Sequence, residues 1–210
     1  MNLLIYDNFL IFPNKLRELA LSSQFYNCKQ YSEKHNSHTD WPGKRTEPIY
    51  DLYPDKVQNL LTEISNISRD VFKLGNVSLR SYFQLTTEQD GHSWVHQDNN
   101  VDLAGILYLS PNPPSNSGTT MYECKDKSKW LSYMNDGAGY ETLKTVNEVD
   151  NPTLYNELFE PKDVIGNTYN RLILYKGDQY HKSNEYFGHD IETGRLTLVF
   201  FISRYNNAQT

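Results

Sequence analysis

The chain has 210 residues, 20 of them basic and 26 acidic, and a formal net charge of −6. This length fits one domain with a sizeable core, and the negative charge disfavours nucleic acids and anionic membrane surfaces as partners. Two cysteines are too few for a disulfide framework, no apolar run is long enough to span a bilayer, and the first residues lack a basic leader. We therefore expect a soluble, cytoplasmic protein.

The N-terminal part, residues 1–75, is expected to be mainly helical. A short strand over 3–5 is followed by apolar residues at helical spacing over about 14–23. The polar stretch 26–50 contains prolines and glycines and is predicted to be a loop. Pro54 then opens the clearest helix of the chain, because apolar residues recur after it at i, i+3, i+4 and i+7.

From residue 76 the apolar positions alternate with a period of two, which is typical of half-buried strands. The predicted strands are 77–86, 94–98, 103–109, 119–123, 171–175, 179–182 and 195–203. Because helices come first and strands come after them, the pattern indicates an α+β protein.

We expect the whole chain, 1–210, to form a single domain. Its helical part is 1–75, and its strands occupy 76–123 and 170–204. The polar range 124–169 is predicted to be an insertion or lid, because a connection of this length is unusual inside a compact domain. A short helix is predicted within it around Leu154, Leu158 and Phe159.

One short motif combines two metal-ligand types. His96-Gln97-Asp98 places an imidazole and a carboxylate two residues apart, which on a strand puts both on the same face. One further imidazole would complete the two-histidine, one-carboxylate set of non-haem iron(II) sites. Such triplets are expected about 0.7 times by chance in this composition, and His38-Thr39-Asp40 is a second one, in a turn. The triplet therefore gains its weight from the motifs that come after it in the chain.

Five elements occur in a fixed order along the second half of the chain. They are His96-Gln97-Asp98, Tyr108-Leu109-Ser110, Ser117-Gly118-Thr119, His181 and Arg195-Leu196-Thr197. This order resembles the prolyl-4-hydroxylase-like branch of the iron(II)/2-oxoglutarate dioxygenases, which has His-x-Asp, Tyr-Leu-Asn, Gly-Gly-Thr, a distal histidine and a basic residue opening the last strand. Two departures are visible, because serines replace the asparagine and the first glycine.

The resemblance implies a double-stranded β-helix, or jelly roll, with the N-terminal helices packed on one sheet. It also implies iron(II) bound by His96, Asp98 and His181, with positions left for 2-oxoglutarate and O2. The implied reaction is hydroxylation of a peptidyl, prolyl-like or small-molecule substrate, with succinate and CO2 as products. His92, four residues before the triplet, is the chief rival ligand, although Gly91 argues against a regular strand there.

An arginine is the best partner for the second carboxylate of 2-oxoglutarate, because its planar guanidinium stays charged when buried and forms two parallel hydrogen bonds. Arg195 is the candidate, since it opens an apolar strand 14 residues after the distal histidine, and Thr197 shares its face. By the resemblance, Tyr108 would offer its hydroxyl to the same carboxylate. Weaker candidates on the preceding strand are Gln84 and Thr86.

Two alternatives stay open. A cupin-type metal enzyme without 2-oxoglutarate typically has His-x-His, which this sequence lacks. A jelly-roll metal-binding or virion protein with no 2-oxoglutarate turnover fits the same ligands, because a ligand set shows capability and not use. Peptide or small-molecule substrates are expected, whereas the segments 26–50 and 124–170 carry no pattern that identifies the substrate.

Overall fold

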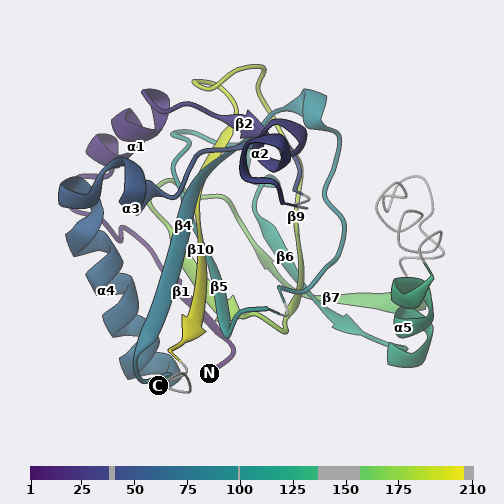
Figure 1. Ribbon diagram of the computed structural model, residues 1–210. Coiled ribbons are helices and arrows are strands. Elements are labelled where there is room, and N and C mark those ends of the chain that lie inside the picture. Colours follow the sequence, from purple (N-terminus) through teal and green to yellow (C-terminus); the bar gives the residue numbers. More distant parts are fainter. Residues whose placement is uncertain (38–40, 99, 137–156, 206–210) are drawn as a thin grey trace.

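The computed structural model describes residues 1–37, 41–98, 100–136 and 157–205. In this part of the chain two antiparallel β-sheets form the centre of the molecule (Figure 1). The larger sheet has the order β1 (Leu3–Tyr6), β8 (Leu172–Lys176), β5 (Leu103–Tyr108), β10 (Arg195–Arg204), β4 (Val77–Thr86), β3 (Lys44–Arg45) and β2 (Tyr26–Asn27). The smaller sheet has the order β7 (Phe159–Ile165), β6 (Thr119–Cys124) and β9 (Tyr180–Ser183).

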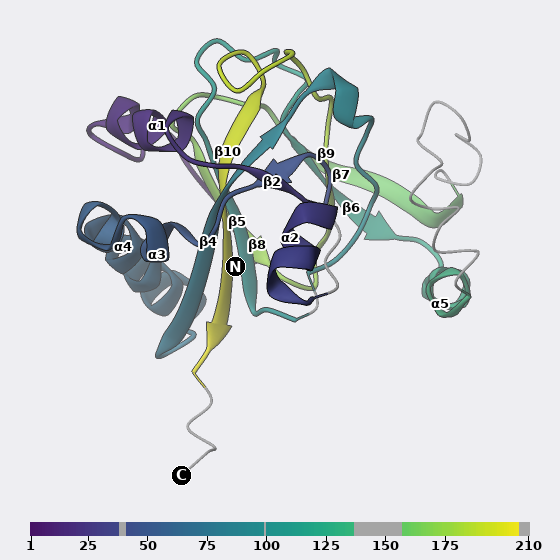
Figure 2. The same cartoon turned by 45° about the horizontal axis from the view of Figure 1, so that its top comes forward.

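Three helices cover one face of the larger sheet (Figures 1 and 2). They are α1 (Pro13–Leu21), α3 (Ile49–Leu52) and α4 (Pro54–Phe72). Proline at the first position starts α4, and Val57, Leu61 and Ile64 form its buried stripe. These residues pack with the large sheet in the main hydrophobic core. The expected helical N-terminal part and its packing on a sheet are therefore present.

The alternation of side chains along β10 divides the apolar core from the space between the sheets. Leu196, Leu198 and Phe200 belong to the core under the helices. Arg195 and Thr197 alternate with them and therefore point to the opposite face. On that face a second apolar cluster packs between the two sheets, and its buried members are Ala104, Ile106, Tyr108, Met121, Ile165, Ile173, Tyr175 and Val199.

The segment 26–50, expected to be a loop, contains regular structure. Besides β2 and β3 it forms α2 (Cys28–His35), which lies apart from the other helices (Figure 2). The Asn27 side chain accepts a hydrogen bond from the Gln30 backbone, and the Gln30 side chain accepts one from the Asn27 backbone. This capping box stabilises a helix without any buried residue. The prediction missed it because it relied on an apolar stripe.

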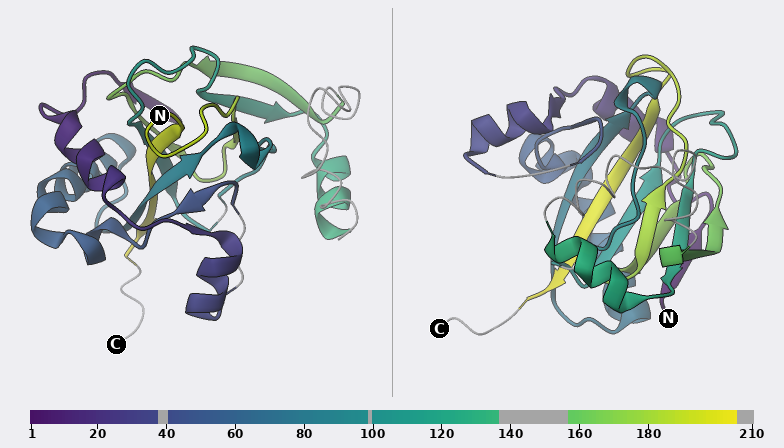
Figure 3. Two further views of the ribbon diagram at one scale, coloured as in Figure 1. Left: turned by 90° about the horizontal axis from the view of Figure 1, so that it is seen from above. Right: turned by 90° about the vertical axis from the view of Figure 1, so that its right-hand side faces the viewer.

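Two further expectations need correction. Residues 94–98 do not form a regular strand, because they pair with β9 only at one bridge, between His96 and His181. Residues 157 and 158 are helical, as expected of the short helix there, but Phe159 already begins strand β7, and Leu154 lies outside the described residues. The described ends of the range expected as an insertion contain α5 (Lys127–Asn135) and β7, seen beside each other in Figure 3. No helix among the described residues combines the length and apolarity needed to cross a bilayer.

Candidate metal centre

Two histidines face each other across the single bridge between the 94–98 segment and β9. The backbone N–H of His96 donates to the His181 carbonyl at 3.0 Å, and the His181 N–H donates to the His96 carbonyl at 2.9 Å. Directly opposed residues of an antiparallel pair project their side chains to the same side. The two imidazole rings accordingly lie 4.3 Å apart between centroids. Backbone pairing thus joins residues that are far apart in the sequence.

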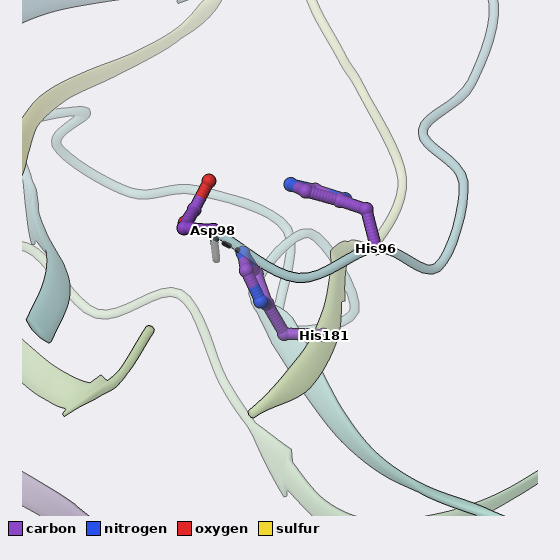
Figure 4. A group of neighbouring side chains, drawn as sticks. All are labelled: His96, Asp98 and His181. Carbon is purple, nitrogen blue, oxygen red and sulfur yellow. Dashed lines mark ion pairs between the residues drawn. The ribbon is translucent and has the colours of Figure 1, made fainter. Parts of the chain in front are cut away.

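Asp98 completes the group (Figure 4). Its backbone N–H donates to the Gly177 carbonyl at 2.8 Å, in the turn between β8 and β9. Its Oδ2 lies 3.5 Å from Nε2 of His181. One ligand atom from each of His96, Asp98 and His181 lies within 4.8 Å of the other two. This separation leaves room for a cation between them.

The hydrogen bonds of the two imidazoles leave one nitrogen of each ring free to bind a metal. Nδ1 of His96 lies 2.9 Å from the Trp94 carbonyl, and Nδ1 of His181 lies 2.9 Å from the Gln179 carbonyl. A carbonyl only accepts, so both Nδ1 atoms carry the hydrogen. The Nε2 lone pairs are then available, and the carbonyls fix the ring orientation.

Burial favours the ligand form of His181. Removal from water, together with the neighbouring His96, lowers its pKa to about 4, although Asp98 opposes the shift. His181 is therefore neutral at pH 7, as a metal ligand must be. Tyr175 packs against the His181 ring at 4.6 Å between centroids, and burial raises the pKa of its phenol well above 10. This tyrosine remains neutral beside the site.

The donor set suits one class of metal. Two imidazoles and one carboxylate are the protein ligands of non-haem iron(II) sites with open positions. The carboxylate supplies one negative charge, and both imidazoles have Nδ1 fixed by a carbonyl. The residues therefore fit an iron(II) ion.

A cavity of about 700 Å³ opens in front of the three side chains. Its walls come from both sheets and from the 26–50 segment. Ala104, Ile106, Tyr175 and Val199 line it from the large sheet, and His181 and Ser183 line it from the small one. This volume is within the usual range of pockets for small ligands.

Arg195, the predicted co-substrate anchor, is on the cavity wall and is only 2 % exposed. Its Nε donates to the Ser117 carbonyl at 2.8 Å, and its Nη2 donates to the Gly118 carbonyl at 3.3 Å. The guanidinium carbon lies 5.5 Å from the centroid of the Tyr108 ring. Carbonyls from the turn before β6 thus orient a buried cation without neutralising it.

Of the other predicted co-substrate residues, Gln84 lines the cavity, whereas Tyr108, Thr197 and Thr86 do not border it. Tyr108 and Thr197 pair directly across β5 and β10, and both are fully buried. The Tyr108 hydroxyl hydrogen-bonds Thr119 at 2.8 Å, and Thr197 Oγ1 donates to the Gln84 carbonyl at 3.4 Å. Thr86, which pairs with Arg195 across β4 and β10, has a buried hydroxyl with no hydrogen-bond partner among the described residues.

The rival residues lie elsewhere. His92 does not belong to the three-residue group found among the described residues. Arg171 and Arg204 are engaged at the surface, where they form ion pairs with Asp7 and Asp102. His38-Thr39-Asp40, the second His-x-Asp triplet, includes residues outside the described part of the chain.

Sequence reasoning missed two residues that shape this region. Arg45 lines the cavity from β3, in the segment expected to be a loop. Gly177 lies so close to the Asp98 turn that a Cβ there would be 2.1 Å from the Val101 carbonyl oxygen and 2.7 Å from that of Asp98. A lone glycine after a strand gives no sign of such a contact in the sequence. A basic residue among the aromatic residues of 26–50, by contrast, could have suggested that this segment lines a binding site.

Comparison with solved structures identifies the fold. A prolyl hydroxylase from Trichoplax adhaerens, in complex with a hypoxia-inducible-factor peptide, has a TM-score of 0.55 at 15% identity, covering 97% of this chain and 84% of that one. HygX from Streptomyces hygroscopicus, with nickel and 2-oxoglutarate bound, has a TM-score of 0.60 at 10% identity, covering 100% and 88%. The chain has the fold of these prolyl hydroxylases and iron/2-oxoglutarate oxygenases, as the motif order predicts. At such identities the similarity establishes the fold alone.

The family is shown by the sequence itself. Residues 1–202 match the family described as "Family of unknown function (DUF6445)", and the chain belongs to it. No curated protein matches the chain.

Proposed function

We propose that the protein is an iron(II)- and 2-oxoglutarate-dependent dioxygenase, a hydroxylase of a peptidyl, prolyl-like or small-molecule substrate, built as one domain on a double-stranded β-helix. The observation that carries the proposal is the convergence of His96, Asp98 and His181 at the wall of a cavity. Iron(II) held by these residues would supply the redox chemistry that couples substrate oxidation to the conversion of 2-oxoglutarate and O2 into succinate and CO2.

The chain's own residues bind and orient the co-substrate in this proposal. Arg195 forms charge-assisted hydrogen bonds to the carboxylate that does not face the metal. Burial raises the Tyr108 pKa, so its phenol stays protonated and donates to the same carboxylate while it accepts from Thr119. The orphan hydroxyl of Thr86 would gain a partner there. Apolar side chains of the cluster between the sheets exclude water from this end.

The test is an anaerobic titration of the metal-free protein with iron(II) and then 2-oxoglutarate, with O2 admitted at the end. The expected result is a visible charge-transfer band on addition of 2-oxoglutarate, and succinate after O2 is admitted. The Asp98→Ala variant should lose both signals. The matched control is His189→Ala, which removes an exposed histidine paired with Glu88, and it should retain them.

Absence of the band and of succinate in the wild-type protein would refute the dioxygenase proposal. Retention of both in Asp98→Ala would refute the ligand assignment.

A further inference from the structure

A second guanidinium lines the cavity and has no role in the proposed binding of iron or 2-oxoglutarate. Arg45 on β3 pairs with Gln84 on β4, and its Nε donates to Gln84 Oε1 at 3.0 Å. The Gln84 side-chain amide in turn donates to the Pro42 carbonyl at 3.1 Å. This chain of hydrogen bonds fixes Nε and leaves the two terminal nitrogens of the guanidinium as donors.

Aromatic rings hold the plane of this guanidinium. Its central carbon lies 4.8 Å from the Trp41 ring centroid and 5.4 Å from that of Phe201. Trp41 is itself fixed, because its backbone N–H donates to the Cys28 sulfur at 3.0 Å and Tyr31 of α2 packs edge-on against its ring at 5.2 Å. Arginine between aromatic rings is preorganised for a planar, two-pronged anion.

The charge of Arg45 is not balanced within the described part of the chain. No carboxylate of the described residues forms an ion pair with it, whereas Arg171 and Arg204 each have an aspartate partner. Burial lowers the pKa of Arg45, and Asp98 is the group that most opposes this lowering. A metal bound to Asp98 would take up that carboxylate's charge. A half-buried cation is then left facing the cavity, and such a group is costly without an anionic partner.

Arg45 is separate from the co-substrate anchor. It pairs with Gln84, which pairs with Thr197 on β10, so two strand spacings, roughly 10 Å, separate Arg45 from the strand of Arg195. Arg195 is almost completely buried, whereas Arg45 is half-buried next to α2. Two cations at this separation suit two different anionic groups in one cavity.

We propose that Arg45 binds a carboxylate of the primary substrate, so that the substrate is an organic acid whose apolar or aromatic body packs on Trp41 and Phe201. This inference rests on the proposed function, because only an enzyme has a substrate. Binding of the acid by Arg45 does not require turnover. Arg80, on the same face of β4 and also on the cavity wall, adds positive potential at the exposed side.

The test compares a carboxylate with its neutral counterpart. The probes are 3-phenylpropionate and 3-phenylpropionamide, titrated by calorimetry into the full chain, both metal-free and loaded anaerobically with iron(II) and 2-oxoglutarate. A charge-assisted hydrogen-bond pair predicts that the wild-type protein binds the acid about tenfold to a hundredfold more tightly than the amide. Added salt should narrow this difference.

Variants assign the preference to one side chain. Arg45→Met should bring the acid-to-amide ratio close to one, and Arg45→Lys should restore part of it, because lysine keeps the charge without the planar fork. The matched control is Lys44→Met, which removes a positive charge from the neighbouring, exposed residue of β3 whose side chain points to the other face. That variant should keep the wild-type ratio.

Three results would overturn the proposal. The first is that the wild-type protein binds the acid no more tightly than the amide. The second is that a folded Arg45→Met variant keeps the preference for the acid. The third is that this variant weakens binding of 2-oxoglutarate instead, which would make Arg45 a co-substrate residue. Because the probes are also titrated without metal, a carboxylate preference in a protein that makes no succinate would refute the dioxygenase proposal and leave the Arg45 site standing.

Discussion

Replacing Gly177 by alanine should weaken metal binding without touching a ligand. A Cβ at this position would meet the Val101 carbonyl oxygen at 2.1 Å and the Asp98 carbonyl oxygen at 2.7 Å, whereas ordinary contact begins at 3.4 Å. Both neighbours are backbone, so the turn that carries Asp98 must move by a distance on the order of 1 Å. Metal sites tolerate errors of only about 0.2 Å in ligand distance.

We expect Gly177→Ala to lower iron(II) affinity by about 10- to 100-fold, the range found when the support of a ligand is lost. Anaerobic competition against a chromogenic chelator measures this, with a thermal melt to check folding. Gly166→Ala is the matched control, because the nearest atom to its Cβ would be the Ser115 carbonyl oxygen at 3.5 Å. Equal affinity of both variants and the wild-type protein would show that the Asp98 turn does not depend on Gly177.

Two further predictions concern Arg195 and His181. Arg195→Lys keeps the positive charge but loses the planar, two-pronged guanidinium, so the affinity for 2-oxoglutarate should fall by about tenfold or more. Anaerobic calorimetry should show this loss with the iron(II) affinity unchanged. An unchanged 2-oxoglutarate affinity would exclude Arg195 as the anchor. In the metal-free protein the pKa of His181 is about 4 in the folded state, against 6.5 in the unfolded state. Between pH 4 and pH 6.5 the unfolded chain therefore carries a proton on His181 that the folded chain does not. Stability is then highest above pH 6.5 and falls by about 3 kcal/mol as the pH drops towards 4. Urea unfolding at several pH values should show this slope, and His181→Gln should flatten it; an equal slope in both would contradict the burial argument.

The predictable parts of the fold are those in which apolar residues recur with a clear helical or strand period. The stripe of α4 and the alternation of β4 and β10 are visible in the sequence because one face of each is buried in the core. The motif order predicted similarity to the prolyl hydroxylases, and the comparison with solved structures confirms that similarity of fold, whereas the jelly roll itself stays a prediction. The motif order also anticipated that His96, Asp98 and His181 lie together, while metal binding by them stays a prediction.

The parts that were missed depend on local chemistry or on distant contacts. Helix α2 is stabilised by caps around Asn27 and buries no residue, so its pattern lacks an apolar stripe. The 94–98 segment alternates like a strand, yet the Asp98 backbone turns away to Gly177. Arg45 became visible as a cavity residue only once β3 was placed beside β4. Such contacts between distant segments have no trace in local periodicity.

The bridge between His96 and His181 has a consequence for how variants are interpreted. Both hydrogen bonds run through the main chain, so they persist with any residue other than proline at either position. Replacing one of the two histidines by a residue with a shorter side chain therefore removes one metal-ligand atom and leaves the other histidine in place. The substitution then leaves one ligand position empty while the other two ligands stay in place, and we expect added imidazole to occupy the position of a missing histidine side chain.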